Sequence, residues 1–302
     1  MIKCPLCEGN KINLIEIISK KKLIYLNKKL TGKDFSYLIN CDINYYECKQ
    51  CRLRFFYPLI PGDEAFYKSV QKFSWYYMDE KQEFLVARQY INKNDKVLEI
   101  GCGRGAFAKM LLNNYYVGLD VSLNAKLLAK KEGIIVENIP IEIYAELHPN
   151  QYDVVVSFQV LEHVAEPRLF LNSIKKTLKK EGKLILAVPC ENSFLKYTTN
   201  AVLNMPPHHV TRWPNETLQF ISTMFNLEIV GFHHEKLHEM HKSWYLSTIF
   251  ENCLLSNVVV DLSLKRRIVS AIGYILSKIL LKGLKKEMLP DGHTVIVIYK
   301  SI

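Results

Sequence analysis

The segment 96–108 constrains the fold of this 302-residue chain more than any other part. It reads Lys-Val-Leu-Glu-Ile-Gly-Cys-Gly-Arg-Gly-Ala-Phe-Ala, an apolar strand that runs directly into glycines and then into a predicted helix over 106–112. Such a strand, turn and helix are typical of the first unit of a parallel sheet that binds a nucleotide. Gly101, Gly103 and Gly105 lack a Cβ, so the backbone of the turn can approach a ligand closely. The sequence therefore predicts an α/β fold with a ligand at this turn.

Two carboxylates beside the glycines bear on the kind of ligand. The next predicted strand, 115–119, ends in Asp120, which can accept hydrogen bonds from ribose hydroxyls. Glycine spacing alone leaves the ligand open, because the same turn also satisfies the dinucleotide pattern G-x-G-x-x-A. Glu99 favours a cationic ligand group over a pyrophosphate, since like charges repel at close range.

Three blocks of sequence resemble the class I S-adenosylmethionine (SAM)-dependent methyltransferases. They are Val97-Leu-Glu-Ile-Gly-Cys-Gly-Arg-Gly105, Gly118-Leu-Asp120 and Tyr152-Asp-Val-Val-Val-Ser-Phe-Gln-Val-Leu-Glu-His-Val164. The resemblance implies a Rossmann-like sheet, mostly parallel with an antiparallel last strand, and SAM as the cofactor. The residues that it assigns to the cofactor lie in the turn and after the second and fourth strands: Glu99, Gly101, Gly103, Gly105, Asp120, Phe158 and Gln159.

Four parts are predicted along the chain. We expect a zinc-ribbon-like module over 1–60, an aromatic linker or lid over 61–79, the methyltransferase domain over 80–236 and 290–302, and a helical insertion over 237–289. The ring faces in the linker can attract a sulfonium cation, although ordinary packing explains them equally well. The aromatic residues of the linker are Phe66, Tyr67, Phe73, Trp75, Tyr76 and Tyr77.

Two CxxC pairs near the N-terminus predict a metal site. The four cysteines are Cys4, Cys7, Cys48 and Cys51. Four thiolates are the ligands of a tetrahedral structural zinc, and a CxxC turn closes a short disulfide only with poor geometry. Zinc is therefore favoured, with unpaired thiols as the alternative. Apolar runs at 14–18 and 23–26 are predicted to be short strands of the ribbon.

A loop rich in proline and histidine follows the predicted fifth strand. It reads Met205-Pro-Pro-His-His-Val-Thr-Arg-Trp213 and, together with Tyr46-Glu-Cys-Lys-Gln-Cys51, it resembles methyltransferases that have an N-terminal zinc ribbon and modify sugars, glycans or other small metabolites. An imidazole titrates near neutral pH, so a histidine is predicted to be the general base. We prefer His209 to His208, because adjacent side chains usually face opposite ways, and His163 is a third catalytic candidate. Local packing is the alternative for all three.

The net charge of +10 invites a nucleic-acid interpretation. The charge lies at the ends, since residues 1–60 hold 11 basic and 5 acidic side chains and 261–302 hold 8 and 3, whereas 61–165 hold 11 and 14. The basic amphipathic segment 261–288 can contact an anionic membrane, although such a helix is more often a solvated face over a packed stripe or a dimer contact. The first ten residues do not have the pattern of a secretory signal, so a cytoplasmic protein is expected.

These features predict a SAM-dependent methyltransferase that acts on a hydroxyl, or on a carbon, of a small molecule, sugar or glycan precursor. Two alternatives remain at this point. An RNA methyltransferase would use the ribbon and both basic ends to hold phosphates. A non-catalytic protein would use the same fold as a scaffold for a partner.

Overall fold

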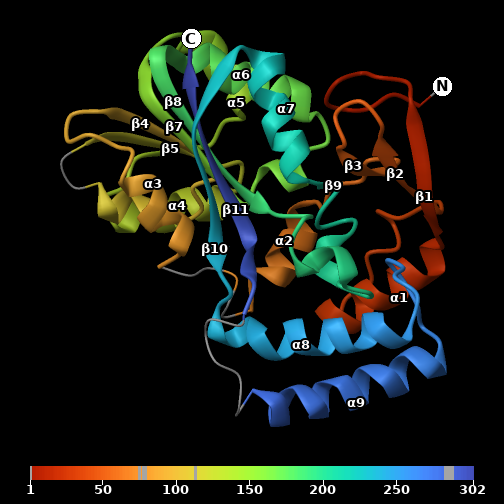
Figure 1. Ribbon diagram of the computed structural model, residues 1–302. Coiled ribbons are helices and arrows are strands. Elements are labelled where there is room, and N and C mark those ends of the chain that lie inside the picture. Colours follow the sequence, from red (N-terminus) through yellow and green to blue (C-terminus); the bar gives the residue numbers. More distant parts are fainter. Residues whose placement is uncertain (1, 74–75, 77–79, 112–113, 282–288) are drawn as a thin grey trace.

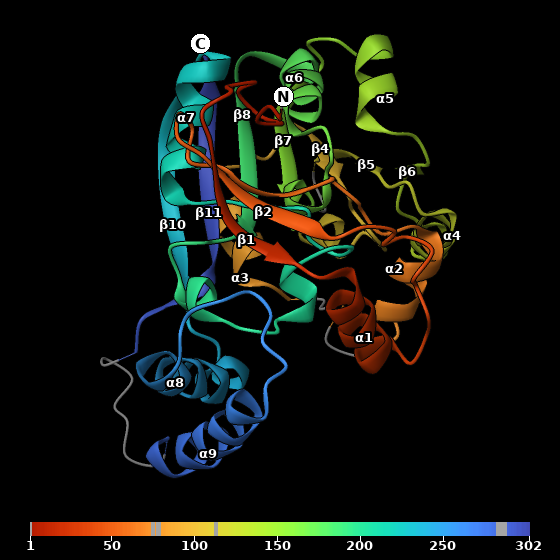
Figure 2. The same ribbon diagram turned by 90° about the vertical axis from the view of Figure 1, so that its right-hand side faces the viewer.

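The computed structural model describes residues 2–73, 76, 80–111, 114–281 and 289–302. A seven-stranded sheet forms the centre of the molecule, and a four-stranded sheet lies beside it (Figures 1 and 2). The strands of the large sheet are β4 Lys96–Ile100, β5 Tyr115–Leu119, β6 Val136–Glu137, β7 Tyr152–Phe158, β8 Leu178–Pro189, β10 Leu227–Lys236 and β11 Asp291–Ser301. Their order across the sheet is β10-β11-β8-β7-β4-β5-β6.

The strand directions confirm the predicted fold class. Strands β6, β5, β4, β7 and β8 pair in parallel, whereas β11 runs antiparallel to both of its neighbours, β8 and β10. This is a Rossmann-like sheet with an antiparallel last strand. The carboxyl ends of its parallel strands meet at one edge, so the loops that follow β4, β5, β7 and β8 gather there.

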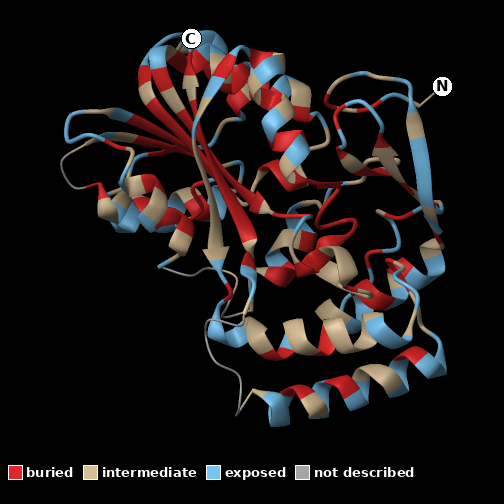
Figure 3. Ribbon diagram, in the orientation of Figure 1, coloured by how far each residue is buried: buried red, intermediate tan, exposed pale blue. Residues whose placement is uncertain are grey.

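Helices cover both faces of the large sheet, because its central strands are apolar on both faces. In β7, Val155 packs into the core that helices α5, α6 and α7 cover, whereas Val154 and Val156 pack into the core under α3. Buried strand residues run along the whole centre of the sheet (Figure 3). The helices around it are α3 Gln82–Arg88, α4 Leu123–Lys131, α5 Ile141–Leu147, α6 Pro167–Thr177 and α7 Asn215–Phe225.

The small sheet joins the N-terminal segment to the histidine-rich loop. Its strands are β1 Ile12–Ile18, β2 Ile43–Cys48, β3 Arg54–Tyr57 and β9 Thr211–Arg212. Strand β9 lies within the loop and pairs antiparallel with β3, where Phe55 faces Thr211. In addition, the Phe56 N–H donates to the Val210 carbonyl at 3.0 Å. The predicted ribbon is therefore hydrogen-bonded to the loop that holds two of the predicted catalytic histidines.

The predicted strand at 23–26 is wrong, whereas that at 14–18 is confirmed within β1. Residues Lys20–Thr31 form helix α1, in which Leu23 and Leu26 lie on the buried face. A run of four apolar residues does not distinguish a strand from a helix, and here the helical spacing of the buried residues decides. Gly32 ends the helix with a left-handed φ of 71°.

The helix predicted over 106–112 is shorter than expected. Phe107–Met110 form a 3₁₀ turn, after which Leu111 leaves the helical region with φ −114° and ψ 37°. The chain has to turn here into β5, which begins at Tyr115. Residue 112 lies outside the described residues.

Two helices lie in the part of the predicted insertion, between β10 and β11, that the structure describes. Helices α8, Glu239–Leu254, and α9, Leu264–Leu280, lie side by side at one end of the molecule, away from most of the sheet (Figures 1 and 2). Within the described residues, no helix is both long enough and apolar enough to cross a bilayer. The linker contains α2, Glu64–Val70, and the predicted lid residues Trp75 and Tyr77 lie outside the described residues.

Candidate active site

A cavity of about 1270 Å³ opens at the carboxyl ends of the parallel strands. It brings together residues that lie far apart in the sequence, from the glycine turn after β4 to the histidine-rich loop. The residues from the sequence prediction that line it are Glu99, Gly101, Gly103, Asp120, Phe158, Gln159, His163, His208 and His209. Gly105 is not among the lining residues that the structure describes.

The glycine turn requires glycine for two different reasons. Gly101 has a φ of 72°, and a Cβ built on it would lie 2.3 Å from Val160 Cγ2, so the position has neither the backbone freedom nor the space for a side chain. Gly103 has a φ of 53° and faces the cavity. Gly105 has a φ of 79°, and a Cβ there would meet the side chain of Ile134 at 2.8 Å. It therefore shapes the turn from behind.

Asp120 holds the turn in place and still faces the cavity. Its Oδ2 accepts a hydrogen bond from the Gly103 N–H, and its Oδ1 accepts one from the Ser122 N–H, both at 2.8 Å. Burial raises the pKa of this carboxyl, although the two N–H donors act in the opposite direction. Each carboxylate oxygen has a second lone pair, which remains available for a ribose hydroxyl.

Glu99 is buried at the end of β4, and its Oε2 accepts a hydrogen bond from the Tyr116 hydroxyl at 2.5 Å. Burial raises the pKa of Glu99 to about 8, so the carboxyl is mostly protonated at pH 7 unless a cation lies beside it. A cationic ligand group would restore the carboxylate. The turn, Asp120 and Glu99 together therefore fit a nucleoside with a positively charged end, as SAM has.

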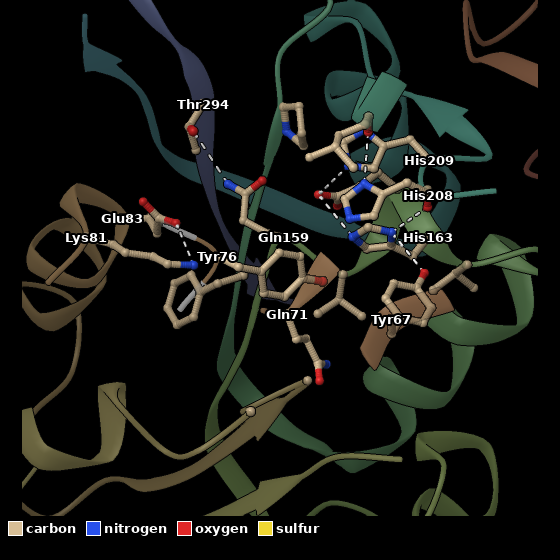
Figure 4. Close-up of a pocket in the computed structure, with 18 of the residues that line it drawn as sticks. Tyr67, Gln71, Tyr76, Lys81, Glu83, Gln159, His163, His208, His209 and Thr294 are labelled. Carbon is tan, nitrogen blue, oxygen red and sulfur yellow. Dashed lines mark hydrogen bonds and ion pairs between the residues drawn. The ribbon is translucent and has the colours of Figure 1, made fainter. Parts of the chain in front are cut away.

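Phe158 and Gln159 form the wall after β7. The ring of Phe158 packs at 5.0 Å from the rings of both Phe84 and Phe107, so it belongs to the core as well as to the cavity. Gln159 adopts a left-handed φ of 57°, and its Nε2 donates to Thr294 Oγ1 at 3.5 Å (Figure 4). That hydrogen bond connects the wall to β11.

The three predicted catalytic histidines lie together at one end of the cavity (Figure 4). Their ring centroids are 4.6 to 4.8 Å apart, and the rings of His208 and His209 are stacked. The expectation that these two neighbours face opposite ways is wrong. Both backbone N–H groups point to the Met205 carbonyl in a turn, which presents both side chains to the same cavity.

Each imidazole is held through Nδ1. The Nδ1 of His163 lies 2.6 Å from the His208 carbonyl, and that of His208 lies 2.9 Å from the Leu203 carbonyl. A carbonyl oxygen only accepts, so Nδ1 carries the hydrogen and Nε2 keeps its lone pair. In His209 the Nδ1 lies 3.2 Å from the side-chain Oδ1 of Asn204, which assigns the same tautomer.

Burial keeps this cluster uncharged. Loss of water lowers the pKa of His163 to about 4 and lowers the pKa values of His208 and His209 well below their usual range. Neighbouring Glu162 is also buried, which raises its pKa to about 8. Neutral imidazoles can accept a proton or bind a metal, because their lone pairs are free.

Several cavity residues were assigned no role from the sequence. Glu162 and Asn204 support the histidine cluster, and only Glu162 had a signal, since it stands next to His163 in the block quoted above. Trp244 from α8 and His293 from β11 also line the cavity. They reach it through strand pairing and helix docking, which no local pattern indicates.

The four predicted zinc ligands form a second cluster, in the small sheet. The sulfur atoms of these residues all lie within 4.8 Å of one another: Cys4, Cys7, Cys48 and Cys51. The closest pairs, Cys4 with Cys51 and Cys7 with Cys48, are each 3.5 Å apart. Sulfurs that bind one tetrahedral zinc at 2.3 Å are about 3.8 Å apart, so the arrangement fits this ion.

Comparison with known families places the central domain. The profile of a family described as a methyltransferase domain matches residues 71–231, which is more than half of the chain. The chain belongs to this methyltransferase family. The match covers the glycine turn, Asp120 and the whole histidine cluster, and it ends before the helical insertion.

Two curated relatives match the methyltransferase in part. A ubiquinone biosynthesis O-methyltransferase of Klebsiella pneumoniae (strain 342) is 31% identical over 161 residues, which are 47% of this chain and 66% of that protein. An uncharacterized protein of Methanocaldococcus jannaschii is 38% identical over 114 residues, 37% of this chain and 49% of that protein. The chain thus spans less than two thirds of the length of these relatives.

Solved structures include a SAM-dependent methyltransferase from Archaeoglobus fulgidus. The two sequences are 19% identical, and the structural alignment covers 72% of this chain and 92% of the Archaeoglobus chain with a TM-score of 0.49. The YcgJ protein from Bacillus subtilis gives the same TM-score at 13% identity, covering 72% of this chain and 97% of that chain.

Proposed function

We propose that this methyltransferase transfers a methyl group from SAM to a hydroxyl, or to a carbon, of a small molecule, sugar or glycan precursor. The observation that carries the proposal is that the glycine turn and the histidine cluster line one cavity. Glu99, the glycine turn and Asp120 would hold SAM, which would supply the methyl group. An acceptor hydroxyl that takes the methyl group must give up its proton. The chain orients both partners and promotes departure of that proton.

An oxygen of a small acceptor is the preferred target. A relative with 31% identity is named an O-methyltransferase, which supports oxygen over carbon. The segment around the cofactor turn carries more acidic than basic residues, which disfavours a polyanion such as RNA. The test is to incubate extracts from a deletion strain with the protein and methyl-labelled SAM. We expect one labelled metabolite; labelled RNA would overturn the small-acceptor assignment, and no labelled product would favour a scaffold.

Asp120→Asn is expected to weaken SAM binding about 10- to 100-fold. The change removes the negative charge and replaces one acceptor oxygen of the carboxylate with an NH₂ group. A hydrogen bond to a charged group contributes roughly 1.5 to 3 kcal/mol. Isothermal titration with SAM measures the effect. The matched control is Asp95→Asn, since Asp95 also accepts a backbone N–H, from Asn92, but does so in an exposed turn. Unchanged affinity in Asp120→Asn would refute the assignment of this residue to the cofactor.

We also propose that Cys4, Cys7, Cys48 and Cys51 hold a structural zinc ion. The sulfur distances support it, and a site with four protein ligands leaves no open position for catalysis. The ion would brace the small sheet and, through the pairing of β3 with β9, the histidine-rich loop.

Helix α9 supports a further proposal, that the methyltransferase contacts an anionic membrane surface. The helix turns its polar side inward, where Arg266 lies 3.6 Å from Glu251 and the Ser277 hydroxyl bonds to Ser243 of α8. Exposed positions recur along α9 (Figure 3). Its outward stripe is apolar, and residues 264–280 contain basic but no acidic side chains. The residues of the stripe are 45 to 72% exposed: Leu264, Ile268, Ile272, Ile275 and Ile279. The membrane-contact prediction extends to 288, of which 282–288 lie outside the described residues.

Ile272→Glu combined with Ile275→Glu is expected to lower binding to phosphatidylserine-containing vesicles at least tenfold. An isoleucine side chain that becomes buried in the membrane contributes roughly 1.5 to 3 kcal/mol to binding. Co-sedimentation measures it, with pure phosphatidylcholine vesicles as the charge control. Leu147→Glu is the matched variant, since Leu147 is 65% exposed on α5. If vesicles do not sediment the wild type and the double variant instead dissociates a dimer, the stripe is a contact between copies of the chain.

A further inference from the structure

The histidine end of the cavity also contains a buried carboxyl group that has no hydrogen-bond partner among the described residues. Glu162 is 1% exposed, and neither of its side-chain oxygens has a hydrogen-bond partner among the described residues. Its Oε1 lies 3.9 Å from Nε2 of His163 and equally far from Nε2 of His209. The Nε2 of His208 is also buried without a described partner. Unsatisfied groups of this kind are rare in folded proteins, and here Glu162 and His208 both line the same end of the cavity.

The three histidines have the geometry of a metal centre, and Glu162 lies beside two of them. One ring nitrogen from each of the three histidines lies within 4.8 Å of the other two. Nitrogens that bind a single tetrahedral zinc at 2.0 to 2.1 Å are about 3.4 Å apart, so small side-chain shifts close the site. Three imidazoles and a carboxylate are ligands that zinc and other divalent transition metals accept.

The surroundings of the histidines have the form that metal ligands require. A ligating imidazole usually donates its second N–H to a carbonyl or carboxylate, which fixes the ring and its tautomer. Here His163, His208 and His209 each have a protein oxygen within 3.2 Å of Nδ1, so Nε2 is the nitrogen left to bind an ion. Packing alone would not need a protein oxygen at Nδ1 of all three rings, nor would it leave both buried oxygens of Glu162 without a hydrogen-bond partner among the described residues.

We propose that His163, His208, His209 and Glu162 bind a divalent metal ion, with zinc as the best match, at the acceptor end of the cavity. The centre is separate from the cysteine site in the small sheet. All four side chains line the cavity, so an ion and an acceptor can both reach them. Zinc accepts a fifth ligand, which allows an acceptor oxygen to bind to the ion.

The metal centre would activate the acceptor hydroxyl, a role that rests on the proposed methyl transfer. A divalent ion lowers the pKa of a hydroxyl that it binds, so the proton can leave to water before the methyl group arrives. Three neutral imidazoles and one carboxylate leave one positive charge on the complex, which suits an anionic oxygen. The inferred acceptor therefore has a hydroxyl that can coordinate a metal.

Metal content of the full chain, without an affinity tag, tests the proposal. After dialysis against buffered zinc, mass spectrometry of the wild type is expected to find two zinc equivalents per chain. His208→Gln and Glu162→Gln are each expected to retain one. His241→Gln is the matched control, since His241 lines the same cavity outside the cluster, and it is expected to retain two.

Two further measurements do not depend on loss of a ligand. Cobalt that fills the proposed centre is expected to show ligand-field absorption without thiolate charge-transfer bands, unlike cobalt at the cysteines. Asn204→Ala removes the oxygen that accepts a hydrogen bond from His209 Nδ1. It is therefore expected to weaken metal binding at the histidine centre about 10- to 100-fold. Circular dichroism and SAM titration of each variant identify a folding defect.

One zinc equivalent in the wild type would overturn the metal centre, and so would two equivalents in all variants. These results are distinguishable from failure of the proposed function. A chain with one equivalent that still methylates an acceptor refutes only the metal centre, whereas two equivalents without SAM binding refute only the methyl transfer.

Discussion

Cys48→Ser is expected to release zinc from the small sheet and to unfold the sheet together with the histidine-rich loop. A structural zinc contributes on the order of 10 kcal/mol to a small metal-dependent fold, so loss of one ligand removes a large part of that stabilisation. Cys48 is fully buried at the end of β2, and its sulfur lies 3.5 Å from that of Cys7. A serine hydroxyl is a poor replacement for a thiolate at this site.

The effect should reach the active site because the two regions share a core. Met205, from the histidine-rich loop, packs with Ile43 and Phe56 of the small sheet. The guanidinium of Arg212 lies 5.0 Å from the Tyr45 ring and donates to the Asn204 carbonyl at 2.7 Å. Loss of the small sheet therefore removes contacts that support the loop at Met205 and at Arg212.

Hydrogen exchange over 205–213, with zinc analysis, measures the outcome of Cys48→Ser. We expect fast exchange in this loop and loss of the cysteine-bound ion. Cys253→Ser is the control, since Cys253 is exposed on α8 and outside the cluster. Slow exchange in Cys48→Ser with normal zinc content would contradict the structural role.

Gly101→Ala is expected to weaken SAM binding at least 100-fold. The new Cβ would lie 2.3 Å from Val160 Cγ2, so either the turn or the cavity wall must move. In addition, a left-handed φ of 72° costs an alanine roughly 1 to 2 kcal/mol. The displaced atoms line the cavity, where the cofactor is proposed to bind. Isothermal titration with SAM measures the change.

Two matched variants separate the clash from the backbone strain. Gly32→Ala has nearly the same φ, 71°, but a Cβ there meets nothing within 4 Å, so only a small loss of stability and normal SAM affinity are expected. The double variant Gly101→Ala with Val160→Ala removes the colliding methyl groups and should recover part of the affinity. If Gly101→Ala binds SAM as tightly as the wild type, the turn is not the cofactor site.

The local chemistry of short segments determined the fold class and most of the site. Residues 96–108 predict a strand and a ligand-binding turn because glycine spacing and apolar runs act through the backbone itself. Two CxxC pairs predict a thiolate cluster because four sulfurs at that spacing suit one ion. The turn and each CxxC pair survive folding, since neighbours in the sequence stay neighbours in space. The two pairs themselves meet only in the tertiary structure, where the closest sulfurs join Cys4 to Cys51 and Cys7 to Cys48.

The tertiary structure decided the contacts between distant segments. No local pattern indicates that β9 pairs with β3, or that His163 meets the loop at 208–209, because strand pairing and turn geometry choose those partners. Periodicity in α9 revealed an apolar stripe but not its direction; the polar contacts with α8 turn it outward. The sequence by itself determined which chemical groups this methyltransferase carries, and only packing decided that three imidazoles gather at one end of the cavity with Glu162 beside two of them.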